Sequence, residues 1–426
     1  MKRVRTLVFW LHLAAGVSAG VVILVMSATG VILALKPQIL NHVDRDVRFV
    51  APQDGDRLAP SQLVTAARVL KPGATPVSLA LDRDPSASAA VSFGRDATVY
   101  VDPYSGDVLG EGSAPTQQFF RSVENWHRWL AMDGESRATA RAITGAANLM
   151  FLGLAVSGLF LWWPHKWLPQ HMRAILFFRR TATARARDFN WHNVIGFWCA
   201  PVLIILTATG AVMSYPWANR LLYQIAGSPL PGGGGPGERP GARGARSERR
   251  AETLPGNLDA LWSRAEQQMP SWRTITVRLP ENENGPVSFT LTDSQSWNAF
   301  ARSQLTLDAT TGDVRRWEPY DATTRGQKWR GWVRFGHTGE LGGIGGQLLA
   351  GVASLGGVVL VWTGIALALR RLFAWLSGVS MFGWRWASAP ARARPPSRSG
   401  TPETPRSNGW RGLRTSASTR RSARAR

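Results

Sequence analysis

Four long apolar runs stand out along the chain, separated by stretches that are far more polar. None of the four contains Asp, Glu, Lys or Arg. Each exceeds the roughly 20 residues that an α-helix needs to cross about 30 Å of hydrocarbon. A backbone in that medium must satisfy its own hydrogen bonds, so runs of this length form helices. The pattern predicts four transmembrane helices at residues 6–35, 142–163, 191–217 and 344–369.

The first run follows the basic segment Met1-Lys-Arg-Val-Arg5, as a secretory signal would. It is too long for the apolar region of a signal peptide, and no small-residue cleavage site of the usual kind follows it. We therefore interpret it as an uncleaved first membrane helix.

Lys and Arg gather on one side of the four predicted helices. They precede helix one, fill the short loop at 165–190 and follow helix four at Arg370 and Arg371. The positive-inside rule assigns that side to the cytoplasm. The sequence thus predicts a multi-pass protein of a bacterial inner membrane with both termini in the cytoplasm and two long extracytoplasmic segments.

Several short motifs occur twice along the chain, in the same order. Ser27-Ala-Thr-Gly30 matches Thr207-Ala-Thr-Gly210 at an offset of 180 residues, and the same offset carries His12 onto His192. Later matches follow the same order in each half, which predicts two similar halves, each built as helix, soluble domain, helix. These matches are Asp102-Pro-Tyr-Ser-Gly-Asp-Val108 with Asp308-Ala-Thr-Thr-Gly-Asp-Val314, and Ser157-Gly158 with Thr363-Gly364.

Each extracytoplasmic segment reads as a small α+β domain. Apolar spacing of three and four residues predicts helices at 60–70 and 258–269. Alternating positions predict strands at 77–81, 89–93, 97–101, 274–279, 287–292 and 304–307.

These elements divide the chain into eight segments. They are helix one at 1–36, the first soluble domain at 37–141, helix two at 142–164, the cytoplasmic loop at 165–190, helix three at 191–217, the second soluble domain at 218–343 with a disordered insert at 229–252, helix four at 344–371, and a largely disordered cytoplasmic tail at 372–426.

Composition changes this picture little. The net charge of +22 lies mostly in the loop, the insert and the tail. Those places suit membrane topology, disorder and anionic lipid better than a nucleic-acid groove, so we expect membrane lipid and no nucleic acid among the partners. The single cysteine, Cys199, lies within predicted helix three, so no disulfide holds the soluble domains.

Two histidines within the predicted membrane helices suggest the chemistry. An ionisable residue in such a helix is a candidate functional residue. His12 and His192 fall at comparable depth near the cytoplasmic face, each followed by small residues at the next two turns. Such a strip admits a flat group, although it also lets helices pack closely. Two imidazoles on facing helices can hold a haem iron between them.

A second, looser pair lies on the other side of the membrane. His127 precedes helix two and His337 precedes helix four, and Arg128 and Arg334 lie near enough in sequence to face haem propionates. Each histidine can instead be an interfacial anchor or a simple hydrogen-bonding residue. His42 is the rival ligand on this side.

The remaining histidines and motifs add little. His165 and His171 lie in the basic loop as expected surface residues. The chain has no Cys-x-x-Cys-His motif for covalent haem attachment and no nucleotide or flavin motif. Any electron donor must then come from outside the chain, as quinol or a partner protein.

Over roughly residues 1–375 the chain resembles the PepSY-associated transmembrane family. The features that carry the resemblance are the histidine positions in helices one and three together with several short motifs. These motifs are Trp126-His127-Arg128, Val156-Ser-Gly-Leu-Phe-Leu-Trp-Trp-Pro164, Asn190-Trp-His192-Asn and the two Asp-x-x-Ser/Thr-Gly-Asp turns.

The resemblance implies PepSY-type folds for the soluble domains. It also implies kinship with iron-uptake proteins, including ferric-siderophore reductases with two b-type haems. In such a scheme His12 with His192, and His127 with His337, would be the axial ligand pairs of the two haem irons.

The leading hypothesis is therefore a di-haem b electron-transfer protein that reduces an extracytoplasmic acceptor, with a ferric siderophore as the candidate. The alternative is a haem-free protein whose PepSY domains regulate a peptidase or bind an envelope partner. A transporter is disfavoured, because no Asp, Glu, Lys or Arg lies within the four apolar runs.

Overall fold

The structure is a computed structural model of the whole chain. It describes residues 2–94, 97–163, 169–231, 255–280, 285–296 and 298–377. One compact unit extends to Phe373. The predicted insert at 229–252 falls almost wholly outside the described residues, as does the predicted tail beyond residue 377.

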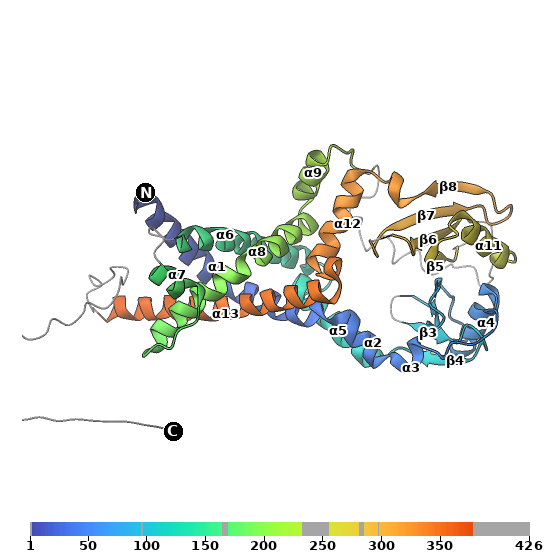
Figure 1. Cartoon of the computed structure of the whole chain (residues 1–426), viewed down its shortest axis with the longest axis horizontal. Helices are drawn as coiled ribbons and strands as arrows, with labels where there is room; N and C mark the ends of the chain where they lie inside the picture. The colour runs from blue at the N-terminus through green and yellow to red at the C-terminus, as the bar shows by residue number, and fades with distance from the viewer. Residues whose placement is uncertain are drawn as a thin grey trace, which may run out of the picture. The chain divides into compact units, whose positions relative to one another are not determined.

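Among the described residues, four helices are long and apolar enough to cross a membrane. They are α1 (Lys2–Ala34), α6 (Ser136–Trp162), α8 (Ala184–Ser214) and α13 (Gly343–Leu376). Figure 1 shows them side by side in one bundle. Large apolar side chains such as Val21, Ile205 and Trp362 remain exposed on its outer surface, as lipid-facing positions require. The four predicted membrane helices are confirmed.

Small residues let the helices of the bundle approach closely. A Cβ placed on Gly357 of α13 would lie 2.8 Å from Oγ of Ser27 in α1, and one on Gly20 of α1 would lie 3.2 Å from Ile365 in α13. Ala19, Ile23 and Ala147 form the buried apolar centre between α1 and α6. Without a hydrophobic drive between helices in lipid, such close van der Waals packing is what holds them together.

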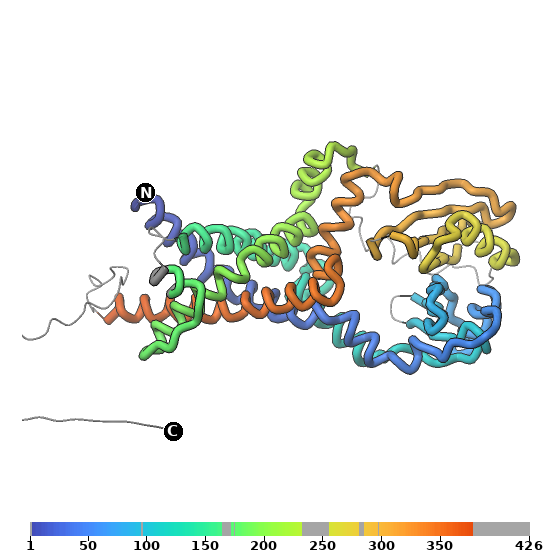
Figure 2. The backbone as a smooth tube through the Cα atoms, in the orientation of Figure 1, coloured from blue at the N-terminus to red at the C-terminus, as the bar shows by residue number. Residues whose placement is uncertain are grey.

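Shorter helices connect the bundle to the strands (Figure 2). The first connection comprises α2 (Lys36–Val43) and α3 (Arg45–Arg48) on the way out and α5 (Ala114–Trp129) on the way back. The second comprises α9 (Pro216–Ile225) on the way out and η1 (Tyr320–Ala322), α12 (Arg325–His337) and η2 (Glu340–Gly342) on the way back. The cytoplasmic loop of the prediction contains α7 (Pro169–Leu176).

Local signals fix where the two returning helices begin. Oγ of Ser113 accepts a hydrogen bond from the backbone N–H of Thr116 at the start of α5. Thr324 and Gln327 form a capping box at the start of α12, which satisfies backbone donors that a helix leaves free at its first turn. Gly339, with φ of 76°, turns the chain from α12 into α13. A Cβ at Gly339 would lie 2.6 Å from the carbonyl oxygen of Gly346, so only glycine fits.

The strands form one antiparallel sheet. From the first soluble segment come β1 (Ser78–Asp82), β2 (Ala89–Ser92), β3 (Thr98–Val101) and β4 (Val108–Glu111). From the second come β5 (Trp272–Arg278), β6 (Val287–Asp293), β7 (Arg302–Leu307) and β8 (Val314–Glu318). The order is β4-β3-β2-β1-β5-β6-β7-β8. The pairing of β1 with β5 therefore joins the strands of the two predicted domains into one sheet.

One face of the sheet is covered and the other is polar. Helices α4 (Pro60–Leu70) and α11 (Leu258–Gln268) pack Leu63, Leu261 and Trp262 onto inward residues such as Ile275 and Phe289. The alternate residues point away from this core, as the two-residue period of a strand dictates. On β5, β6 and β7 those outward residues are mainly Thr, Ser, Gln and Arg.

The predicted strands and soluble helices are found at nearly their predicted bounds. β4 and β8 were not predicted. Each follows an Asp-x-x-Ser/Thr-Gly-Asp turn, and each contains too few apolar residues to show alternation. Helix α8 begins seven residues before the apolar run that predicted it, because a helix can extend beyond the lipid through polar residues such as Arg185 and Asp188.

Candidate functional site

The histidines of the first predicted pair face each other within the bundle. His12 on α1 and His192 on α8 have ring centroids 6.5 Å apart, with the ring planes at 82°. Nδ1 of His12 lies 2.8 Å from Oγ of Ser157 on α6. Nδ1 of His192 lies 2.9 Å from Oγ1 of Thr363 on α13. Four membrane helices thus contribute to this group, which we call the inner site.

The second predicted pair lies on α5 and α12, against the other ends of α1 and α8. His127 near the end of α5 and His337 at the end of α12 have ring centroids 6.4 Å apart, with the ring planes at 61°. Nδ1 of His127 lies 2.9 Å from Oγ1 of Thr29 on α1. Nδ1 of His337 lies 3.1 Å from Oγ1 of Thr209 on α8 and 2.9 Å from the carbonyl oxygen of Leu206. We call this group the outer site.

The hydroxyl groups determine which ring nitrogen carries the proton. A hydroxyl has one proton to donate, and that of Thr363 lies 2.7 Å from the carbonyl oxygen of Val359 in its own helix. The hydroxyl therefore accepts from Nδ1–H of His192. The hydroxyls of Thr29 and Thr209 make the same 2.7 Å contact with a carbonyl oxygen four residues earlier. At His337 the assignment is independent of any hydroxyl, because the carbonyl oxygen of Leu206 can only accept.

A protonated Nδ1 leaves Nε2 as the nitrogen with a free lone pair. The contacts of these four rings with Ser157, Thr29, Thr363, Thr209 and the Leu206 carbonyl oxygen are all made through Nδ1. A hydrogen bond at one nitrogen that orients the ring and raises the basicity of the other is the usual support of a metal-binding histidine. The rings of His127, His192 and His337 are held in this way, and His12 contacts Oγ of Ser157 through the same nitrogen.

A glycine follows each hydroxyl residue and lies under the same ring. A Cβ on Gly158, Gly210 or Gly364 would lie 3.5, 3.3 and 3.4 Å from Cε1 of His12, His337 and His192 respectively. A Cβ on Gly30 would lie 3.7 Å from Cε1 of His127. The Ser/Thr-Gly dipeptide thus supplies an acceptor for Nδ1 and room for the edge of the ring.

The ring separations suit one metal ion per pair. Imidazole nitrogen binds metals at about 2 Å, so two rings on opposite sides of one ion have centroids roughly 6 Å apart. The observed 6.5 Å and 6.4 Å agree with that spacing. Within the described residues, no group of three or more His, Cys, Asp or Glu side chains could hold a metal ion. Any metal here would need its remaining ligands from a cofactor such as a porphyrin.

The two sites are separated by equal lengths of helix. His12 and Thr29 on α1 are seventeen residues apart, and so are His192 and Thr209 on α8. At 1.5 Å rise per residue this is about 25 Å along each helix. That length approaches the thickness of the hydrocarbon core of a bilayer, so the inner and outer sites lie towards opposite ends of the membrane-spanning bundle.

Burial affects the pKa of both histidines of the outer site. Burial, with a smaller effect of the neighbouring His337 ring, lowers the pKa of His127 to about 4. Burial also lowers the pKa of His337. Both rings are therefore neutral at pH 7, which is the form that binds metal.

Two arginines add positive charge beside these neutral rings. Arg128 directly follows His127, and Arg334 lies three residues before His337. Burial lowers the pKa of Arg128, the nearby carboxylate of Glu124 opposes this effect, and positive groups that include Arg334 lower the pKa further. Neither guanidinium forms an ion pair with any residue that the structure describes. Both lie over aromatic rings, those of Trp129 and Phe335.

The strips of small residues beside the inner histidines serve helix packing. A Cβ placed on Gly16 would lie 3.8 Å from Leu154, and one on Gly196 would lie 3.5 Å from Leu360, both on neighbouring helices. Of the two uses that the sequence left open for the strips, the structure favours close packing between helices.

The other histidines take no part in either site. His42 is exposed on α2 and does not join the outer pair. His165 and the side chain of His171 fall outside the described part of the chain. The residues that sequence reasoning overlooked are the ring partners Thr29, Ser157, Thr209 and Thr363. The sequence signal for them is the Ser/Thr-Gly dipeptide, which recurs at matched positions along the chain.

Four membrane-crossing helices joined to an antiparallel sheet with covering helices define a multi-pass membrane protein with a PepSY-type α+β region. The model of one family, described as the PepSY-associated TM region, matches residues 9–371. The chain belongs to that family. Comparison with curated proteins gave no match.

Proposed function

We propose that this protein is a di-haem b electron-transfer protein of a bacterial inner membrane. The observation that supports it most is the pair of matched histidine sites. In each site two rings make a hydrogen bond through Nδ1 and have centroids 6.4–6.5 Å apart. A haem iron held by two imidazoles changes between the ferric and ferrous states and so supplies one-electron transfer.

The protein's own residues have distinct roles in this proposal. His12 and His192 hold the inner haem, and His127 and His337 hold the outer one. Arg128 and Arg334 have no ion-pair partner in the described part of the chain, and their guanidinium groups suit the carboxylates of haem propionates.

The two sites, about 25 Å apart along α1 and α8, would carry electrons across the membrane. The donor comes from outside the chain, as quinol or a partner protein, because no nucleotide or flavin motif is present. The Lys and Arg distribution supports an orientation with the inner site near the cytoplasm and the outer site on the opposite side of the membrane. A ferric siderophore, reduced from Fe(III) to Fe(II), is the acceptor that the family resemblance suggests.

We also infer that the protein consists of two similar halves. The histidine, hydroxyl and glycine positions recur in each half with matched spacing, and the strand order runs outward in chain order from the central pair β1 and β5. A duplicated half supplies one ligand to each haem. This arrangement explains why both pairs contain one histidine from each half.

The test is a haem count on histidine variants. The protein is expressed with adequate haem, purified in detergent, and assayed by pyridine haemochrome together with oxidised and dithionite-reduced spectra. We expect two b-type haems per chain. The double variants His12→Ala/His192→Ala and His127→Ala/His337→Ala should each lose one haem, whereas the control His42→Ala should keep both.

An unchanged haem-to-protein ratio in both double variants would refute the proposal. A protein that stays colourless after haem supplementation would favour the other candidate class, a haem-free regulator that acts on a peptidase or an envelope partner.

A further inference from the structure

The polar face of the sheet contains a pocket that the histidine sites do not use. Its volume is about 430 Å³, which lies in the usual range for small-molecule sites. The residues that line it come from β1, β5, β6 and β7 and from the loop before β7. They are Asp82, Arg273, Thr274, Thr276, Thr290, Thr292, Ala299, Phe300 and Arg302. We call it the threonine pocket.

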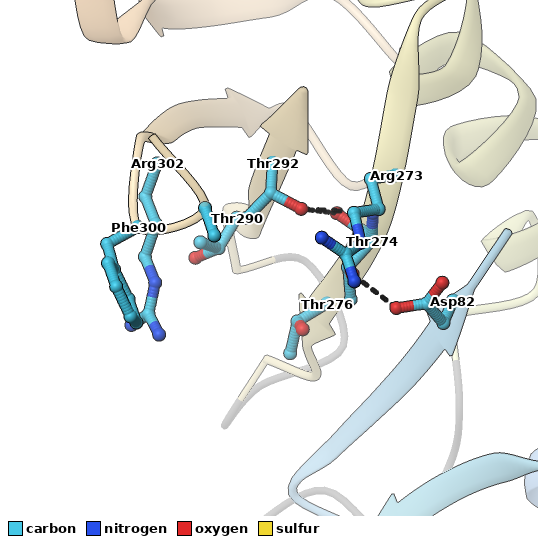
Figure 3. Close-up of a pocket in the computed structure, with 9 residues that line it drawn as sticks. Asp82, Arg273, Thr274, Thr276, Thr290, Thr292, Phe300 and Arg302 are labelled. Carbon is cyan, nitrogen blue, oxygen red and sulfur yellow. Dashed lines mark hydrogen bonds between the residues drawn. The ribbon is translucent and has the colours of Figure 1, made fainter. Parts of the chain in front are cut away.

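Strand register explains why these hydroxyls converge. Thr274 pairs with Thr292 and Thr276 pairs with Thr290 across β5 and β6. Directly paired residues of antiparallel strands point to the same face. Figure 3 shows the threonines projecting from these two strands, with Phe300 and Arg302 alongside each other at one wall. The next pair in the register, Thr292 with Arg302, brings a guanidinium to the same face.

The charge of the pocket favours an anion. Arg273 and Arg302 are both exposed, and neither forms an ion pair or a side-chain hydrogen bond with any described residue. The one acid, Asp82, already accepts hydrogen bonds from Oγ1 of Thr274 at 2.9 Å and from the backbone N–H of Asp84 at 3.0 Å. Its two oxygens are therefore engaged within the protein, whereas both guanidinium groups are available. Each offers planar donors suited to carboxylate oxygens.

Phe300, which lines the pocket, contacts a residue that is close in sequence to the outer site. The ring of Phe300 stacks on that of Phe335, with centroids 3.7 Å apart and planes at 19°. Phe335 lies two residues before His337 on α12. A ligand against Phe300 would therefore be connected to the outer site through one stacked aromatic pair.

We propose that the threonine pocket binds a small anionic chelate through its carboxylate oxygens. The guanidinium groups of Arg273 and Arg302 hold those oxygens, and the hydroxyl of Thr276 and the face of Phe300 complete the contact. That this ligand is also the electron acceptor rests on the proposed function. The binding itself does not.

A redox-inert probe tests the binding alone. The Ga(III) complex of EDTA, a monoanion with outward carboxylate oxygens, is titrated into the purified full-length protein by calorimetry. The neutral Ga(III) tris-acetohydroxamate complex is the charge control. We expect the anion to bind and the neutral complex to bind at least about 10-fold more weakly. Arg273→Gln/Arg302→Gln should raise Kd about 10-fold, since the variant lacks both exposed ion pairs to the ligand.

Arg278→Gln is the matched control, because Arg278 is exposed on β5 but does not line the pocket. Its Kd should equal that of the wild type. Absence of binding of the anion at millimolar concentration, or equal affinity of the double variant and the wild type, would overturn the proposal.

A second assay separates this proposal from the proposed function. Fe(III)–EDTA is mixed with the dithionite-reduced protein, and the haem spectrum is followed. If the gallium complex binds through Arg273 and Arg302 but the protein has no haem or is not reoxidised, the electron-transfer function fails and the binding site stands. If reoxidation occurs with equal rates and equal saturation in the double variant and in Arg278→Gln, the pocket is not where the acceptor binds.

Discussion

Replacing Ser157 by Ala removes the single hydrogen-bonding partner that His12 has among the described residues, an Oγ 2.8 Å from Nδ1. The rings elsewhere are held by threonine, and His337 has a second acceptor in the carbonyl oxygen of Leu206 at 2.9 Å. Thr209→Val therefore leaves Nδ1 of His337 with a partner, whereas Ser157→Ala leaves Nδ1 of His12 with none. The two substitutions are a matched pair that differ in this one respect.

The expected magnitude follows from the lost partner. A buried donor left without a partner costs about 1–3 kcal/mol. His12 is half-buried, so we take the lower part of that range, about 1.5 kcal/mol, which corresponds to a roughly 10-fold weaker inner site. Losing an outer partner of a metal-bound imidazole typically weakens metal affinity about 10- to 100-fold, which agrees. For Thr209→Val we expect less than about threefold, because the hydrogen bond to the Leu206 carbonyl oxygen persists.

Equilibrium titration of haem into the haem-depleted variants, together with their thermal unfolding in detergent, measures both effects. Ser157→Thr is the conservative control and should behave as the wild type, because threonine holds the other three rings. The reasoning is refuted if Ser157→Ala matches the wild type in haem affinity and unfolding temperature, or if Thr209→Val loses as much. The unfolding measurement remains informative without haem, since the unpaired donor destabilises the haem-free protein as well.

Three further substitutions probe packing, charge and pH. Gly210→Ala would place a Cβ 3.3 Å from Cε1 of His337, tight enough to displace the ring, and we expect loss of the outer haem in the haemochrome assay with the inner haem retained. Asp188→Asn breaks the 2.6 Å ion pair between Arg370 and Asp188, which is 2 % exposed. We expect thermal unfolding to show a stability about 1–2 kcal/mol lower. This is less than the cost of breaking a fully buried ion pair, because the Arg370 side chain is partly exposed. Backbone N–H groups, and then Arg315, lower the pKa of Asp308 to about 2. The stability this contributes is complete above the unfolded pKa of about 3.9 and is lost as pH falls towards 2, so Asp308→Asn should lower stability at neutral pH and flatten the acid unfolding profile in that window.

The membrane helices could be predicted from the sequence because a charge-free apolar run of more than about 20 residues forms few structures other than a membrane helix. The predicted strands were also found, since their alternation follows burial on one face. The joining of the strands into one sheet was not predicted. It depends on β1 pairing with β5, and Leu79 and Val277 meet across almost two hundred residues of chain. The residues of β1 and β5 alone do not indicate whether each strand remains at the edge of its own sheet or pairs with the other strand.

The histidine pairs could be proposed from the sequence because a repeat constrains depth. Residues at equivalent places in two similar halves tend to meet near the axis that relates the halves, and His12 and His192 do meet. The ring partners could not be assigned in this way. Which threonine faces which ring depends on helix rotation and crossing, and neither is encoded in the spacing within one helix.

The Ser/Thr-Gly dipeptide also resolves a difficulty that a histidine creates inside a membrane. A ring with two nitrogens needs a partner for its N–H, or the buried donor costs free energy in a medium without water. The hydroxyl of Thr363 meets that need while its own proton remains bonded to a backbone carbonyl within α13. The adjacent glycine lets the ring come close enough for this bond. One dipeptide thus gives the histidine a hydrogen-bonding partner inside the bundle and room for its ring. A change that keeps the histidines but removes the dipeptides should therefore weaken the sites, by less than removing the histidines does.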